Sequence, residues 1–309
     1  MEPEHIKSRL KGAMTALVTP FSKSEVDLDG LARLVRWQID GGIDGLVACG
    51  TTGEAPTLSS EERLAVIRTC VDAAGGKVPV VAGTGSNGTD ATIAATAAAE
   101  AAGADAALVV TPYYNKPTQE GLFRHFEAVA RAVSIPIIAY NVPSRTGVDL
   151  LPATVERLAD VPGIVGLKDA TGDLSRPQRF PATLRDRFLL FSGHDATAFD
   201  FNTMGGSGTI SVVANVAPRL CADMHEACRN GDHHRARMIH HSLRPMIAAL
   251  EMETNPIPVK YALQLMLGLK ADLRLPLTEA LPETREAVRA AILALVAEMH
   301  EGRQVDRVA

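Results

Sequence analysis

The sequence of 309 residues has few cysteines and no Cys-x-x-Cys pair. The four cysteines stand at positions 49, 70, 221 and 228, and a chain of this length does not need disulfide bonds to be stable. We interpret them as reduced thiols that pack like small hydrophobic residues. This usage indicates the cytoplasm rather than a secreted protein.

Long apolar runs and a secretory signal are also missing. The most apolar-looking stretch, residues 91–110, is mostly alanine and contains Glu100 and Asp105, which excludes a membrane-spanning helix. Residues 1–5 include acids where a secretory signal has bases, and no apolar run follows them. We therefore expect a cytoplasmic protein without membrane contact.

A strong excess of charge of one sign is absent too. The formal net charge at pH 7 is −5 and the isoelectric point is near 6.0, so no basic face dominates to suit nucleic acid. Hydrophobic residues at 46% and charged residues at 22% are ordinary for a globular protein. The composition therefore predicts a globular protein that does not bind nucleic acid.

Eight short, mostly β-branched runs recur about every 20–35 residues, the length of one strand–helix unit. They cover residues 15–19, 45–49, 78–82, 106–111, 135–140, 164–168, 188–192 and 208–213. The runs are apolar throughout, as in parallel strands covered on both faces. Eight such units close a barrel, whereas five or six would favour an open sheet. We predict a (β/α)8 TIM barrel.

After residue 217 only helical patterns follow. They cover residues 221–230, 232–251, 258–269 and 284–300. No low-complexity linker precedes them, so we expect these helices to pack on the barrel. The predicted domains are a catalytic barrel over residues 1–230 and an appended C-terminal helical domain over residues 231–309.

Polar residues gather where the predicted strands end, which is where barrel enzymes place their chemistry. The segments are residues 50–54, 111–115, 140–147, 168–172 and 192–195. Lys168 ends an apolar run, so its stem is expected between barrel walls. A poorly solvated amine there can attack a carbonyl and form a Schiff base. The alternative, a lysine paired with an acid at the barrel rim, stays open on position alone.

Further residues at the strand ends would complete such chemistry. Tyr140, one strand away, can donate and accept protons as a carbinolamine collapses, and Thr51 can pass that proton on. Thr51 and Thr52 offer hydroxyls and backbone amides to a carboxylate. Arg145, in a turn flanked by proline and glycine, could clasp a second carboxylate. Taken singly, Tyr140 could equally be a core residue and Arg145 an exposed loop residue.

Seven segments resemble the dihydrodipicolinate synthase / N-acetylneuraminate lyase family of class I, pyruvate-dependent aldolases. They are GTTGE (50–54), AGTGSN (82–87), TPYYNKP (111–117), YNVPSRTG (140–147), GLKDATG (166–172), GGSGTISVVAN (205–215) and NPIPVK (255–260). The resemblance implies a barrel with a C-terminal helical domain, usually assembled as a homotetramer that is a dimer of dimers. It implies a lyase that condenses pyruvate with L-aspartate 4-semialdehyde, at the entry to diaminopimelate and lysine, with no metal or organic cofactor.

The resemblance also implies a role for each site residue. Lys168 would form the Schiff base, and Tyr140, Thr51 and Tyr114 would form the proton relay, with Tyr114 reaching in from a neighbouring subunit. The implied substrate-binding residues are Thr52 for the pyruvate carboxylate, Arg145 for the semialdehyde carboxylate, Ile210 through its backbone carbonyl, and Gly193 and Asn255.

Two alternative functions compete with this interpretation. Another aldolase of the family, acting on a different aldehyde or sugar acid, would look different at Ser144-Arg145, and sialate lyases tend to have Ser-Thr where this chain has Thr51-Thr52. A non-enzymatic binding or regulatory barrel would show a gap among the lysine, tyrosines and threonine, and the sequence shows none. The synthase is therefore preferred.

Two further features predict that a regulatory site and a metal site are absent. Where lysine-regulated members of the family have a serine, a histidine and an acid, this chain has Ala55, Arg63 and Ala91, which predicts weak or absent inhibition by L-lysine. The pairs His233-His234 and His240-His241 lack carboxylate or cysteine partners at ligand spacing. We interpret them as a solvated helix face and predict no metal site.

Overall fold

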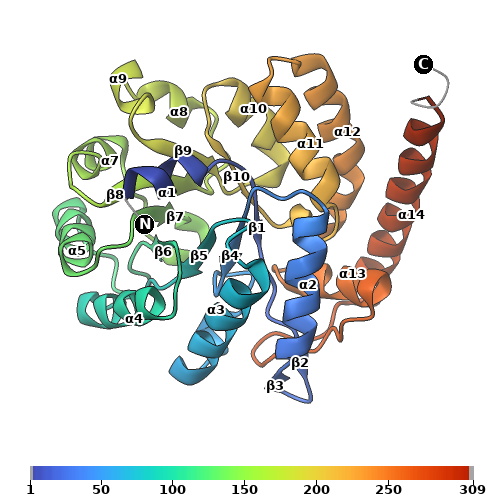
Figure 1. The fold of residues 1–309 in the computed structure, drawn as a ribbon, viewed down its shortest axis with the longest axis horizontal. Helices are drawn as coiled ribbons and strands as arrows, with labels where there is room; N and C mark the ends of the chain where they lie inside the picture. The colour runs from blue at the N-terminus through green and yellow to red at the C-terminus, as the bar shows by residue number, and fades with distance from the viewer. Residues whose placement is uncertain (1–2, 306–309) are drawn as a thin grey trace.

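The computed structural model describes residues 3–305, within which eight parallel strands close into a barrel (Figure 1). The strands are β1 (Gly12–Ala16), β4 (Gly45–Ala48), β5 (Val80–Gly83), β6 (Ala106–Val110), β7 (Ile137–Asn141), β8 (Ile164–Asp169), β9 (Leu189–Ser192) and β10 (Gly208–Ser211). They follow one another around the barrel in this order, and β10 pairs back with β1. A separate antiparallel hairpin joins β2 (Phe21–Ser22) and β3 (Glu25–Val26). The predicted barrel is confirmed.

The first strand lies earlier than its sequence pattern predicts. We expected it over residues 15–19, but it spans Gly12–Ala16. Gly12 has φ +73°, and a Cβ there would lie 2.1 Å from Asp44 Oδ2, so the chain enters the barrel where only glycine fits. Glycine and alanine have low strand propensity, whereas the β-branched residues that follow have a high one. The prediction therefore placed the strand too far along the chain and included residues 17–19, which are buried but follow the strand.

Helices connect the strands and cover the outside of the barrel (Figure 1). They are α1 (Pro3–Arg9), α2 (Leu28–Asp40), α3 (Ser60–Ala74), α4 (Thr89–Ala101), α5 (Gln119–Ala132), α6 (Pro143–Thr146), α7 (Pro152–Leu158), α8 (Ser175–Arg179), α9 (Ala182–Arg185), α10 (Ala198–Thr203), α11 (Pro218–Arg229), α12 (His233–Leu250), α13 (Ile257–Leu267) and α14 (Pro282–Val305). Helix α3 begins at a capping box, in which Ser59 Oγ accepts from Glu62 N and the Glu62 carboxylate accepts from Ser59 N. This cap fixes the start of the helix at Ser60.

Apolar side chains fill the inside of the barrel. One buried cluster joins residues of six barrel strands with Ile6 of α1 and with Leu10, which directly follows that helix; the strand residues are Met14, Val47, Val81, Leu108, Ile138 and Phe191. Tyr140 and Ile210 belong to the same cluster. Because the interior is a packed core, polar chemistry is confined to the loops at the C-terminal ends of the strands.

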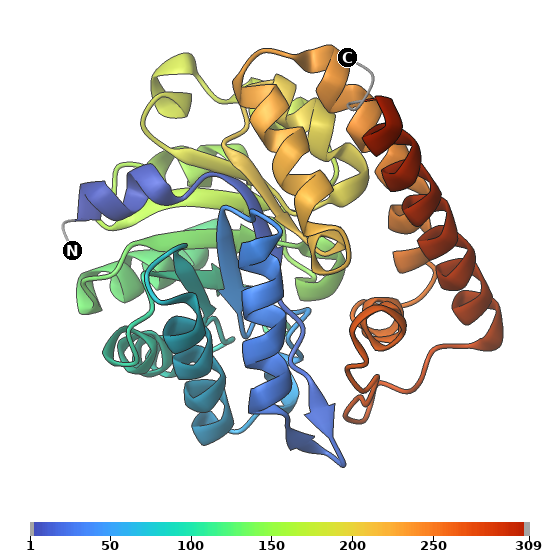
Figure 2. The same cartoon turned by 45° about the vertical axis from the view of Figure 1, so that its right-hand side comes forward.

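The helices that follow β10 pack on the barrel, as predicted. α12 lies against α11, and α14 runs along α12 and α13 at the edge of the molecule (Figure 2). Leu250 and Val288 from these helices share a core cluster with Leu46 and Val80 of the barrel strands. The division of the chain at residue 230 stays a prediction.

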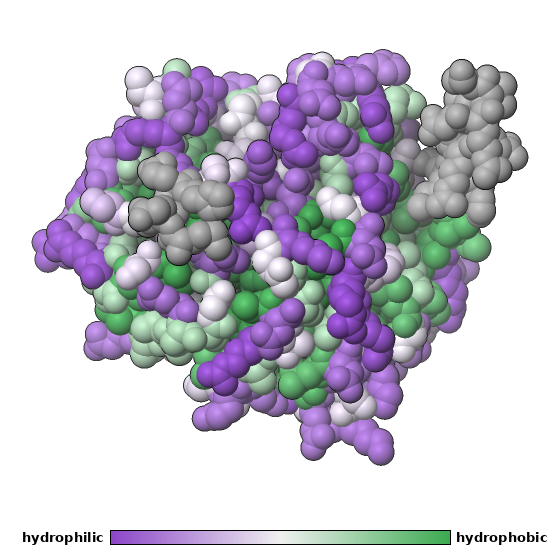
Figure 3. Space-filling model, in the orientation of Figure 1, coloured by the Kyte–Doolittle hydropathy of each residue, from purple (hydrophilic) through white to green (hydrophobic). Residues whose placement is uncertain are grey.

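The outer face shown in Figure 3 is predominantly hydrophilic, with apolar residues in patches between polar ones. Among the described residues, no helix combines the length and the apolarity needed to cross a bilayer. All four cysteines are unpaired, and three of them are buried.

Candidate active site

The pairing of β7 with β8 brings Lys168 and Tyr140 together. The two residues are register partners at the C-terminal ends of their strands. Both are largely buried, with 6% and 7% of their surface exposed. Lys168 Nζ lies 4.2 Å from the centroid of the Tyr140 ring. The sequence placed these residues on neighbouring strands, and the structure places their side chains in contact.

Lys168 is not paired with an acid in the described part of the chain. The carboxylate next to it in sequence, Asp169, instead accepts a hydrogen bond from Arg176 Nε at 2.7 Å. The alternative interpretation, a lysine neutralised by a carboxylate at the barrel rim, is therefore wrong. The amine instead lies against the phenol ring of Tyr140.

Gly193 gives the Lys168 stem the space it occupies. A Cβ on Gly193 would lie 2.8 Å from Lys168 Cε and 2.8 Å from Ala170 Cβ, which leaves no room for a larger residue. Gly193 N also donates to Asp169 O at 2.7 Å, which fixes the end of β9 against β8. The geometry thus gives Gly193 a steric role, while its predicted contact with substrate stays a prediction.

The loop after β4 carries the two predicted threonines and is tied to the start of α13. Thr52 is buried, and its Oγ1 accepts a hydrogen bond from Asn255 Nδ2 at 2.9 Å. Thr51 is half-buried and lines the cavity described below. Asn255 therefore positions the Thr52 hydroxyl, and its own Oδ1 is buried without a partner.

A buried ion pair that no sequence pattern predicted holds the same loop. Glu54 pairs with Lys260 of α13, and Lys260 Nζ also donates to Asp272 O at 2.8 Å. Burial lowers the pKa of Lys260 to about 8, although the Glu54 carboxylate opposes this shift. Glu54 and Lys260 both fall inside matched motifs, GTTGE and NPIPVK, and that was the available signal for their importance.

A cavity of about 260 Å³ opens beside these residues. Thr51, Tyr140 and Arg145 contribute to its lining; Lys168 does not, but its Nζ contacts the ring of Tyr140. Arg145 is exposed on α6, and its Nη2 lies 3.4 Å from Asn255 O. The turn that carries it ends at Gly147 with φ +72°, as the flanking glycine predicted. A phenol and a guanidinium thus share one small cavity next to a buried amine.

The other predicted residues occupy different surroundings. Ile210 is buried on β10 and belongs to the barrel interior cluster with Tyr140. Tyr114 is 88% exposed and has φ +74°, so the single chain leaves its side chain in solvent. Tyr113, next to it, lines the cavity.

The residues at the predicted regulatory positions line this cavity or the one next to it. Ala55 and Arg63 contribute to its lining, and Arg63 Nη2 donates to Ala55 O at 2.6 Å. Ala91 lines an adjacent cavity of about 470 Å³ together with Arg63 and Tyr113. One guanidinium therefore replaces the polar and acidic groups that the regulated members would present there.

The histidine pairs on α12 are only partly a solvated face. His233, His234 and His241 are exposed, but His240 is buried, with Nε2 3.0 Å from Asp195 O and its ring stacked on Phe199. The prediction was wrong for His240, because the helix turns this position toward η2 (Asp195–Thr197) and α10. Among the described residues, no group of three histidine, cysteine or acidic side chains could hold a metal ion.

Comparison with known proteins settles the family. The sequence model of the Dihydrodipicolinate synthetase family matches residues 9–295. The chain belongs to this family. Two relatives of the family, the 4-hydroxy-tetrahydrodipicolinate synthases of Methylococcus capsulatus and Pseudomonas aeruginosa, are 54% and 51% identical to this chain over 284 residues. These alignments cover 92% of this chain and 98% and 97% of the relatives.

Solved structures of the dihydrodipicolinate synthetase family agree with this assignment. The dihydrodipicolinate synthase of Acinetobacter baumannii, complexed with pyruvate, is 45% identical with a TM-score of 0.91. The superposition covers 93% of this chain and 99% of that one. The predicted family is confirmed, and the relatives carry the name of the lyase activity that the sequence predicts.

Proposed function

We propose that this chain condenses pyruvate with L-aspartate 4-semialdehyde through a Schiff base on Lys168. The observation that carries the proposal is the buried Lys168 amine, which has no carboxylate partner among the described residues and lies 4.2 Å from the centroid of the Tyr140 ring, beside a cavity that Tyr140 and Arg145 line. An amine without a counter-ion can serve as a nucleophile toward a ketone. The pyruvate-bound relative of 45% identity supports pyruvate as the first substrate.

The chemistry needs one nucleophile and a proton carrier. The neutral Lys168 amine adds to C2 of pyruvate, and the carbinolamine loses water to give the imine. Loss of a C3 proton gives an enamine, whose C3 forms the new carbon–carbon bond with the aldehyde carbon while the aldehyde oxygen takes a proton. The Tyr140 phenol can move these protons, and Thr51 on the same cavity can relay them. No metal or organic cofactor enters any of these steps.

The two carboxylates need separate partners. We assign the pyruvate carboxylate to Thr52 and the loop around it, where Asn255 holds the hydroxyl in place. We assign the semialdehyde carboxylate to Arg145, whose guanidinium can donate two hydrogen bonds to it in a bidentate geometry. Ile210 is proposed to contribute its backbone carbonyl near the imine, and Gly193 to border the bound pyruvate.

A coupled assay tests the proposal directly. The protein is incubated with pyruvate and L-aspartate 4-semialdehyde, and in separate reactions with pyruvate and sugar aldehydes. The condensation product is measured in each. We expect turnover only with the semialdehyde. Turnover that prefers an aldehyde without a carboxylate would replace this proposal with the related aldolase, and imine formation without condensation would leave a pyruvate-binding barrel.

Replacement Arg145→Ala is expected to raise KM for the semialdehyde about ten- to hundredfold, since a charge-assisted contact to one substrate is lost. KM for pyruvate should change far less, because that substrate does not meet Arg145. Initial rates at varied concentrations of each substrate measure both constants. Arg131→Ala is the matched control, because Arg131 is an exposed arginine on α5 that pairs with Glu127. Equal changes in both KM values would remove the reason for preferring the synthase.

We propose that the chain acts as a homotetramer built from two tight dimers, in which Tyr114 enters the site of the neighbouring subunit. An aromatic side chain that is 88% exposed, on a backbone with φ +74°, is poorly explained within one chain. Activity per chain should fall when the protein is diluted below its dimer dissociation constant, while circular dichroism stays unchanged. Sedimentation measured at the same concentrations identifies the species, and a fully active monomer would contradict the proposal.

Millimolar L-lysine is expected to leave the activity unchanged. An allosteric lysine needs a carboxylate for its ammonium groups, but Ala91 supplies none, Ala55 lacks a hydroxyl, and the Arg63 guanidinium repels a cation. Loss of a charged partner in a partly buried site costs several kcal/mol of binding free energy. Rates measured over a lysine titration check this, and strong inhibition at sub-millimolar lysine would show that another site binds it.

We propose the cytoplasm as the location. The four unpaired cysteines support a reducing compartment. The substrates proposed are small metabolites, and neither nucleic acid nor a membrane is part of the proposal.

A further inference from the structure

Arg176 is a charged residue buried behind the candidate active site, with 5% of its surface exposed. Its guanidinium donates three hydrogen bonds to three partners: Nε to Asp169 Oδ2 at 2.7 Å, Nη1 to Asp149 Oδ2 at 2.9 Å, and Nη2 to Leu150 O at 2.7 Å. Burial by itself lowers the pKa of Arg176, but the two carboxylates outweigh it, so the pKa is raised and the group stays charged.

On one side, Arg176 holds the end of β8. Asp169 directly follows Lys168, and its Oδ2 is bonded to Arg176 while its Oδ1 accepts from Thr171 N at 2.9 Å and from Thr171 Oγ1 at 2.5 Å. Both oxygens of this buried carboxylate are therefore occupied. The residue next to the reactive lysine has no freedom to rotate.

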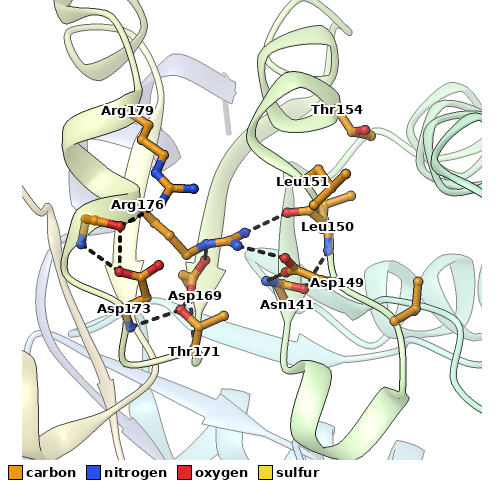
Figure 4. A network of polar contacts seen from close by, with 12 residues as sticks. Asn141, Asp149, Leu150, Leu151, Thr154, Asp169, Thr171, Asp173, Arg176 and Arg179 are labelled. Atoms are coloured by element: carbon orange, nitrogen blue, oxygen red, sulfur yellow. Dashed lines mark hydrogen bonds and ion pairs between the residues drawn. The ribbon is translucent and has the colours of Figure 1, made fainter.

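On the other side, Arg176 holds the end of β7 through Asp149. Asp149 Oδ1 accepts from Asn141 Nδ2 at 2.7 Å, and Asn141 Oδ1 accepts from Leu150 N at 2.9 Å. Asn141 directly follows Tyr140. Figure 4 shows the guanidinium lying between Asp169 and Asp149, with Asn141 beyond Asp149. One side chain thus joins the residue after Lys168 to the residue after Tyr140.

We infer that Arg176 is a positioning residue for the proposed reaction: it locks the ends of β7 and β8 together and so sets the Lys168 amine against the Tyr140 ring. The register of this strand pair shifts between Ile137 and Ile138. The pairing of Tyr140 with Lys168 therefore depends on contacts at the C-terminal ends of the two strands, where Arg176 bridges them. A planar guanidinium reaches three acceptors in fixed directions, and a lysine ammonium does not reproduce that fork. The inference rests on the proposed function, because it concerns the geometry of its nucleophile.

Two variants separate positioning from mere stability. Arg176→Lys keeps the positive charge but loses the planar set of N–H donors that reaches three acceptors. Asp149→Asn keeps the shape, but its amide group faces one of the two donors, Asn141 Nδ2 or Arg176 Nη1, and leaves that donor unpaired. The Asp149 side chain is 33% exposed, so this second variant is expected to fold even if the first does not. Arg187→Lys is the matched control, since Arg187 also bridges a carbonyl and a carboxylate but lies before β9, at the opposite end of the barrel.

The decisive readout is the rate of imine formation on Lys168, followed by rapid mixing with pyruvate, quenching with borohydride and mass spectrometry. Steady-state kcat and KM and the thermal midpoint are measured beside it. We expect Arg176→Lys to slow imine formation and kcat by about ten- to hundredfold, the effect of misplacing a reacting group by about 1 Å. KM for both substrates should change far less, Asp149→Asn should show a smaller loss of the same kind, and Arg187→Lys should show none.

Three results would overturn the inference. If both variants form the imine at the wild-type rate and only their thermal midpoints fall, Arg176 serves stability alone. If KM rises while imine formation is unchanged, the network acts on substrate entry instead. If the wild-type protein forms no imine on Lys168, the proposed function fails first, and this is seen before any variant is compared.

Discussion

Replacement of Lys168 by alanine is expected to abolish condensation and the covalent trapping of pyruvate. Borohydride reduces only an imine to a stable amine, so trapping reports the carbon–nitrogen bond between Lys168 and C2 of pyruvate. Removing a covalent nucleophile lowers kcat by roughly 10⁴-fold or more. The measurement is peptide mass mapping of the wild-type and variant proteins after treatment with pyruvate and borohydride.

A second buried lysine, Lys260, provides an internal comparison for this trapping experiment. Burial lowers the pKa of Lys260 to about 8, so pKa alone would make it a competing amine. Its surface is 1% exposed, and its ammonium is bonded to Glu54 and to Asp272 O, so pyruvate has no access to it. Lys270→Ala, on the exposed surface near Ser22, is the control for loss of a lysine. A reduced pyruvate adduct on Lys260, or on any lysine other than Lys168, would contradict the proposed mechanism.

Lys168 and Tyr140 could be predicted as partners because two simple rules meet at these positions. Apolar runs locate parallel strands, and the ends of such strands in a barrel share one face. Lys168 and Tyr140 each stand at the end of such a run on consecutive strands, which is also where the structure pairs them. The sequence could not decide whether an acid neutralises Lys168, since that depends on where Asp169 points. The structure answers this by turning Asp169 toward Arg176.

The parts of the site that escaped prediction depend on contacts between distant segments. Glu54 meets Lys260 because α13 folds back over the loop after β4, and no local pattern in either segment reports that approach. No sequence pattern marks Arg176, which is buried where its guanidinium meets Asp169 at the end of β8 and Asp149 in the segment between α6 and α7. The start of β1 was missed for the opposite reason, since its glycine and alanine residues carry no strand signal while their neighbours do.

Replacement of Tyr140 by phenylalanine is expected to lower kcat by roughly 10²-fold or more, the usual loss when a positioned general acid–base group is removed. The ring stays, so its packing in the barrel interior and its contact with Lys168 are kept, and the thermal midpoint should hardly move. Pyruvate should still be trapped on Lys168, only more slowly, because the amine remains and the phenol serves proton transfer.

Tyr261→Phe is the matched control for that variant. Tyr261 is also a buried tyrosine, and its hydroxyl has no hydrogen-bond partner among the described residues, so deleting it removes no hydrogen bond. We expect Tyr261→Phe to keep wild-type kcat, with an unchanged or slightly higher thermal midpoint. Steady-state kinetics and timed borohydride trapping of both variants decide the matter. If Tyr140→Phe and Tyr261→Phe turn over equally fast, the Tyr140 phenol carries no proton in the reaction, and its ring serves only to pack against the Lys168 amine.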